Sequence, residues 1–114
     1  MRLTIAGMGP GPAELFTLAA FEAASRADTL VLQTERHPVA AYLSAKGLHF
    51  ETLDELYERS TDFDVFNRSV AAFLREKLKP ATETVLLVWG EGLWAQAMCA
   101  PVLEMSAETG VALR

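Results

Sequence analysis

Residues 2–12 read Arg-Leu-Thr-Ile-Ala-Gly-Met-Gly-Pro-Gly-Pro, an apolar run that passes directly into a turn of alternating glycines and prolines. A helical stretch follows over about 13–26, and a second apolar run occupies 29–32. Short apolar runs are typical of strands buried on both faces of a parallel sheet. The stretch therefore predicts a strand–helix–strand unit. Its glycine turn would lie at the carboxyl end of the first strand, where open parallel sheets bind ligands.

The glycine turn has two chemical interpretations. Gly7, Gly9 and Gly11 permit positive φ and a close approach of another molecule to the backbone. Pro10 and Pro12 stiffen the turn and remove N–H groups that would hold a phosphate. The Gly-x-Gly-x-Gly spacing also differs from the Gly-x-Gly-x-x-Gly of dinucleotide-binding loops. The turn thus favours a flat or neutral ligand over a diphosphate, and a plain connection between strand and helix explains it equally well.

The rest of the chain continues the alternation of strands and helices. We expect helices over about 38–46, 54–57 and 62–79 and from about 93 onward, and strands over about 49–52, 84–89 and 111–114. Asp54 is expected to cap the short helix that begins there. A second glycine turn, 90–92, follows the strand over 84–89. Five strands separated by helices predict a three-layer α/β/α domain with a mostly parallel sheet.

The composition indicates one small acidic domain. The chain has 114 residues and a net charge of −5, which argues against nucleic acid or an anionic membrane as partner because both attract basic patches. A single cysteine, Cys99, forms neither an internal disulfide nor a thiolate cluster, and no metal site is predicted. No signal peptide is visible, and no apolar run approaches the roughly 18 residues of a membrane helix. We therefore expect a cytoplasmic protein.

Four segments in order carry a family resemblance. They are Gly7-Met-Gly-Pro-Gly11 followed by Glu14-Leu-Phe-Thr-Leu-x-Ala20, then Thr34-Glu-Arg-His-Pro38, Phe50-Glu-Thr-Leu-Asp-Glu-Leu-Tyr57 and Trp89-Gly-Glu-Gly92. Together they resemble the tetrapyrrole methylases, S-adenosylmethionine-dependent methyltransferases that act on precorrins and uroporphyrinogen. The two middle segments resemble the subgroup fused to a MazG-type nucleoside triphosphate pyrophosphohydrolase.

The resemblance implies a fold of two α/β lobes with the cofactor in the cleft between them. Residues 1–114 resemble the N-terminal lobe only, so the second lobe is expected to be absent from this chain. The implied sheet order, 3-2-4-1-5, places strands one and four side by side and opens both glycine turns on one crevice. A homodimer and a MazG-type partner domain are also implied.

The resemblance further implies candidate cofactor contacts. Pro10 matches a loop proline that contacts the cofactor. The second ligand loop is matched by Trp89, Gly90 and Glu91, and a further apolar contact by Trp94. By residue chemistry, the tryptophans can stack on adenine or pack in a core or lobe interface. Glu91 can bond a cofactor amine or lie exposed in its turn.

Arg36 and His37 follow the second predicted strand, where they can contact substrate carboxylates. The alternative is a pair of solvated side chains at the start of a helix. No carboxylate pair and no nucleophilic triad has a diagnostic spacing, so no catalytic residue is assigned. Methyl transfer from a sulfonium depends more on proximity and in-line geometry than on such groups.

The chain departs from the family pattern in both glycine turns, and Trp89 and Trp94 are bulkier than the usual residues at their positions. Pro12-Ala13 stands where Asp-Pro is usual, and Gly92 stands where the second loop usually continues into proline. We expect S-adenosylmethionine as cofactor, bound weakly or not at all by this lobe alone. Two interpretations follow: one half of a methyltransferase, supplying one wall of the cofactor cleft, or a non-catalytic regulatory module associated with a MazG-type pyrophosphohydrolase. A nucleotide-binding βαβ protein is disfavoured by the loop prolines.

Overall fold

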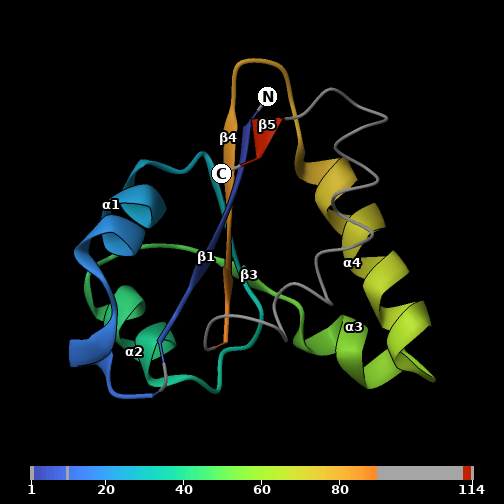
Figure 1. Ribbon diagram of the computed structural model, residues 1–114, viewed down its shortest axis with the longest axis horizontal. Helices are drawn as coiled ribbons and strands as arrows, with labels where there is room; N and C mark the ends of the chain where they lie inside the picture. The colour runs from blue at the N-terminus through green and yellow to red at the C-terminus, as the bar shows by residue number, and fades with distance from the viewer. Residues whose placement is uncertain (1, 10, 90–111, 114) are drawn as a thin grey trace.

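The computed structural model describes residues 2–9, 11–89 and 112–113 of the chain (Figure 1). Its elements follow one another as β1 (Arg2–Gly7), a 3-10 turn η1 (Ala13–Leu15), α1 (Leu18–Arg26), β2 (Thr29–Leu32), α2 (Pro38–Ala45), β3 (Glu51–Thr52), α3 (Asp54–Arg59), α4 (Phe63–Lys77), β4 (Glu83–Val88) and β5 (Ala112–Leu113). The expected helix from about residue 93 lies outside the described residues.

The strands form one sheet in the order β3-β2-β4-β1-β5. Every neighbouring pair is parallel. The longest pairing joins β1 to β4 over six residues, from Arg2 opposite Glu83 to Gly7 opposite Val88. Because β4 lies between β1 and β2, five of its six residues are buried. The parallel α/β class is therefore confirmed.

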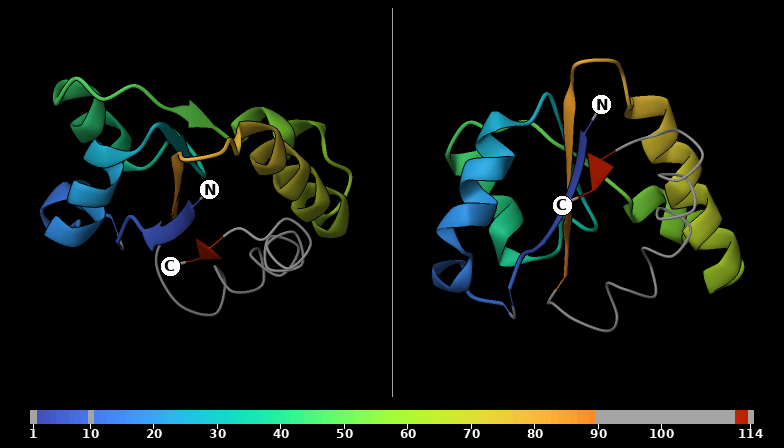
Figure 2. Two further views of the ribbon diagram at one scale, coloured as in Figure 1. Left: turned by 90° about the horizontal axis from the view of Figure 1, so that it is seen from above. Right: turned by 45° about the horizontal axis from the view of Figure 1, so that its top comes forward.

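Helices cover both faces of the sheet. Figures 1 and 2 show α1 and α2 on one side and α3 and α4 on the other. The side chains of β4 alternate between these layers: Leu86 and Val88 join the cluster that contains α4 residues. Val85 and Leu87 join the cluster that contains residues of α1 and α2. The period-2 alternation of a strand thus divides the apolar residues between two cores.

Helix α4 has the predicted amphipathic stripe. Phe66, Val70 and Leu74 recur at helical spacing and are buried in the core on their face of the sheet. The helix begins after Asp62, whose side chain accepts a hydrogen bond from the amide of Val65 at 2.9 Å. It ends at Lys77, two residues before the predicted boundary. Burial of this stripe fixes α4 on the sheet.

Two local predictions were wrong. The helix expected over 13–26 is interrupted, because Phe16 and Thr17 are extended and Thr17 caps α1 by accepting a hydrogen bond from Ala20. Asp54 does not cap α3: it is the first helical residue, and Leu53 occupies the cap position. The carboxylate of Asp54 instead bonds a neighbouring loop.

No helix within the described part of the chain is long and apolar enough to cross a membrane.

Candidate functional site

The carboxyl ends of β1 and β4 lie side by side. Gly7 is the register partner of Val88, and the amide of Met8 donates to the Val88 carbonyl at 2.7 Å. Gly9 and Trp89 therefore leave the sheet at the same edge, where the strand order and parallel direction favour ligand binding. The other predicted residues of these turns, Pro10, Gly90 and Glu91, lie outside the described residues, as does Trp94.

Gly9 is held in a conformation that excludes other residues. Its φ is +83°, and a Cβ atom built there would lie 3.0 Å from the Leu15 carbonyl oxygen. An L-residue is strained at that φ, and the contact is with backbone rather than with a flexible side chain. Gly11, by contrast, has open space around it. Of these two glycines, Gly9 is therefore the one that lies close to η1.

His37 connects the loop after β2 to the glycine turn. The side chain is 1% exposed. Its Nε2 atom lies 2.9 Å from the Gly9 carbonyl oxygen, and its Nδ1 atom accepts a hydrogen bond from the amide of Val39 at 3.1 Å. This second bond caps α2, which begins with Pro38. Both ring nitrogens are therefore engaged within the chain, which leaves none for the expected contact with a substrate carboxylate.

The backbone amide of Trp89 is held by a hydrogen bond, while part of its ring remains exposed. Its amide donates to the Oε1 atom of Gln33 at 2.6 Å, and the backbone amide of Gln33 donates to Leu87 at 2.8 Å. The indole lies perpendicular to the His37 ring, with 5.0 Å between centroids. The residue is nevertheless 44% exposed. A large aromatic surface is therefore presented at the carboxyl edge.

The loop between β2 and α2 has its own hydrogen bonds. The hydroxyl of Thr34, a buried residue, accepts from the amide of Arg36 at 3.1 Å. The carboxylate of Asp54 accepts from the amide of Glu35 at 2.9 Å. Arg36 itself is exposed whereas His37 is buried, so the expectation of two solvated side chains is correct for Arg36 and wrong for His37. The loop is thus fixed from both the β2 and the α3 side, while its charged side chains at 35 and 36 face outward.

Asp54→Ala is expected to lower the free energy of unfolding by about 1–2 kcal/mol, because the Glu35 amide loses its charged acceptor. The matched control is Glu55→Ala in the same helical turn, whose side chain is 79% exposed and forms only a 3.8 Å ion pair with Arg59. That control should change stability by about 0.5 kcal/mol or less. Urea unfolding of both variants measures the difference, and equal losses would show that the Asp54 bond contributes nothing.

The sequence patterns did not identify Gln33 and Asp54 as residues whose side chains hold the backbone at this edge of the sheet. Each closely follows a strand of the parallel sheet, Gln33 directly after β2 and Asp54 two residues after β3, so both lie at its ligand-binding edge. That position was the available signal. Among the residues that the structure describes, no group of three or more His, Cys, Asp or Glu side chains is placed to hold a metal ion.

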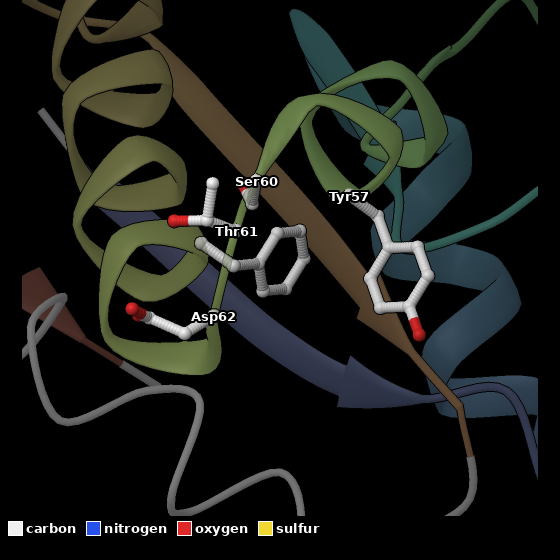
Figure 3. Close-up of a pocket in the computed structure, with 5 residues that line it drawn as sticks. Tyr57, Ser60, Thr61 and Asp62 are labelled. Atoms are coloured by element: carbon white, nitrogen blue, oxygen red, sulfur yellow. The ribbon is translucent and has the colours of Figure 1, made fainter.

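A separate pocket of about 340 Å³ opens between the end of α3 and the start of α4 (Figure 3). It is lined by Tyr57, Ser60, Thr61, Asp62 and Phe66. Two of its polar side chains already form hydrogen bonds within the chain: Asp62 caps α4, and the Ser60 hydroxyl donates to the Leu56 carbonyl at 2.6 Å. The carboxyl edge of the sheet is therefore the better candidate site.

Comparisons with known proteins agree with this architecture. The uncharacterized protein YabN of Bacillus subtilis (strain 168) is 27% identical over 75 residues, which are 66% of this chain and 15% of that protein. The crystal structure of the cobalamin synthesis related protein CobF from Corynebacterium diphtheriae matches 99% of this chain and 51% of its own, with a TM-score of 0.64 and 19% identity. This structural likeness shows a shared α/β fold. The chain thus spans only part of the length of both proteins.

The family assignment rests on a sequence profile. The profile of the tetrapyrrole (corrin/porphyrin) methylases matches residues 2–109, nearly the whole chain. The parallel sheet and its glycine turn at the β1 carboxyl end are consistent with that match. The chain therefore belongs to the tetrapyrrole (corrin/porphyrin) methylase family.

Proposed function

We propose that residues 1–114 form the N-terminal lobe of an S-adenosylmethionine-dependent methyltransferase and supply one wall of its cofactor cleft. The observation that carries the proposal is the meeting of Gly9 and Trp89 at the carboxyl edge, where Gln33 and His37 hold them. A half-exposed indole suits the adenine ring of the cofactor, since aromatic side chains stack on bases. The bound cofactor would supply an electrophilic methyl group.

The residues of this edge suit binding and orientation better than proton transfer. The ring nitrogens of His37 are both engaged, and Asp54 holds the Glu35 amide. The exposed Arg36 is the described side chain best suited to a carboxylate of the methyl acceptor. Transfer of a sulfonium methyl group benefits mainly from holding the two reactants in line, which a rigid wall promotes.

The proposal includes a second lobe, because one wall buries too little of a ligand; typical pockets bury roughly 70–90% of a drug-sized ligand's surface. The 51% coverage of the CobF structure supports a larger protein. Segments 34–38 and 50–57 resemble the MazG-fused subgroup and so favour a MazG-type domain in the same polypeptide or assembly. A second copy of the chain is a further proposed partner. A regulatory module without cofactor binding is the alternative.

The test is the binding of S-adenosylhomocysteine to the full natural polypeptide, mapped by NMR. We expect amide signals of Gly9, Gln33 and Trp89 to shift on titration. Signals of residues 79–82, which precede β4 at the opposite edge of the sheet, should stay in place. Shifts confined to Tyr57 and Ser60 would move the site to the pocket between α3 and α4, and no shifts at all would favour the regulatory module.

A further inference from the structure

The His37 ring stands between three segments that are far apart in the sequence. It contacts Gly9 after β1, lies in the loop that leads from β2 to α2, and packs edge-on with Trp89 after β4. We propose that His37 is a positioning residue: it fixes the Gly9 carbonyl and the Trp89 ring in the geometry that receives the cofactor. This inference rests on the proposed function and deepens it.

The two hydrogen bonds of His37 define its chemical form. A carbonyl oxygen only accepts hydrogen bonds, so the Nε2 atom donates to Gly9. A backbone amide only donates, so the Nδ1 atom accepts from Val39. The ring is thereby a neutral imidazole with its proton on Nε2, and at 1% exposure it has no surface for a ligand. The role left to His37 is geometric.

The hydrogen bond from His37 holds the Gly9 carbonyl. A glycine restrains its own backbone least of all residues, so a carbonyl next to it turns easily unless something holds it. Proline at position 10 has no N–H with which the loop could be fixed from that side. The His37 bond to the Gly9 oxygen therefore restrains this carbonyl from the side of α2. With it, the loop keeps one shape before the ligand arrives.

A preformed wall improves affinity because less of the chain has to be ordered on binding. The same ring also limits the Trp89 indole, at 5.0 Å and an interplanar angle of 83°, while the Gln33 side chain holds the Trp89 amide. Release of His37 would free the Gly9 carbonyl and one side of the indole together. Cofactor affinity should then fall even where the fold survives.

Two substitutions separate the two hydrogen bonds of His37. In His37→Asn, the amide oxygen takes the place of Nδ1 and can still cap α2 through Val39, but the side chain is too short to reach Gly9. In His37→Gln, the amide nitrogen takes the place of Nε2 and can donate to Gly9, but the helix cap is lost. His49→Asn makes the same chemical change at the other histidine, which is exposed. These three variants form a matched set.

The experiment measures the dissociation constant of S-adenosylhomocysteine for the full natural polypeptide by calorimetry, together with its melting temperature. Both His37 variants lose the ring contact with Trp89, so the difference between them reports the Gly9 bond. We expect His37→Gln to bind within about threefold of wild type because it keeps that bond, although its melting temperature falls with the loss of the cap. His37→Asn should bind at least about tenfold more weakly than wild type, because the hydrogen bond to the Gly9 carbonyl is lost. His49→Asn should match wild type in both measurements.

The outcomes distinguish the inference from the proposed function. Wild-type binding with equal affinities for the two His37 variants, or with affinities that follow their melting temperatures, would overturn the positioning role and leave the cofactor proposal standing. Wild-type protein that is folded and does not bind the ligand contradicts the proposed function, and the inference falls with it. Only weaker binding by His37→Asn than by His37→Gln supports a positioning role for the hydrogen bond between His37 and Gly9.

Discussion

Gly9→Ala is expected to lower the free energy of unfolding by about 2–3 kcal/mol. Two effects add at this position. An L-residue at φ +83° costs about 1–2 kcal/mol, and the new Cβ atom would meet the Leu15 carbonyl oxygen at 3.0 Å. Because that oxygen belongs to the backbone of η1, relief requires the turn itself to move. Chemical denaturation of the variant measures the loss.

Two other glycines provide graded controls for Gly9→Ala. Gly47 shares the left-handed conformation, with φ +81°, but a Cβ atom there meets nothing within 4 Å, so Gly47→Ala should cost only about 1 kcal/mol. Gly11 has neither a positive φ nor a near neighbour, so Gly11→Ala should be neutral or stabilising by up to about 1 kcal/mol. Equal losses for Gly9→Ala and Gly47→Ala would contradict the close approach of the turn to η1.

Trp89→Ala is expected to weaken S-adenosylmethionine binding by the full natural polypeptide about 10- to 100-fold, because stacking of an aromatic side chain on a base contributes about 1–3 kcal/mol. The backbone bond from the Trp89 amide to Gln33 does not depend on the side chain and should persist. Trp89→Phe keeps a stacking surface and should retain most of the affinity. Calorimetric titration of the two variants measures the difference.

The result that contradicts this prediction is an unchanged affinity in Trp89→Ala with a lowered melting temperature. Trp89 would then belong to the core or to a lobe interface. The 44% exposure of Trp89 and its perpendicular packing on His37 favour a contact with a ligand at the carboxyl edge of the sheet over burial in a core or lobe interface. The phenylalanine variant keeps an aromatic ring for both stacking and packing, so it is the control for the loss of the ring itself.

The regular parts of the fold could be predicted because their patterns are local. The apolar run of β4 and the stripe of Phe66, Val70 and Leu74 show period 2 and period 3.6 in the sequence itself. The interruption of the first helix at Thr17 was missed, because apolar spacing continues across it while the break depends on a side-chain cap. Boundaries set by caps are therefore less visible than elements set by periodicity.

The site was predicted less completely because its bonds are not local. The sequence indicated that Arg36 and His37 follow a strand, but it did not show that Gly9, 28 residues before His37, accepts from the ring. The same holds for Trp89 and Gln33, which are 56 residues apart and meet only because β2 and β4 are neighbours. The partner of a polar side chain depends on strand order, and residue type alone leaves it open.

Calorimetric titration of S-adenosylmethionine into the full natural polypeptide, with residues 1–114 alone as a second sample, tests whether these residues form one wall of a cofactor cleft. We predict saturable binding at one site per chain by the full polypeptide. Binding by residues 1–114 should be at least about tenfold weaker, because one wall buries only part of the ligand. Equal affinities would show that this lobe holds the whole site. A folded full polypeptide that takes up no S-adenosylmethionine would contradict the assignment of this lobe as a cofactor wall.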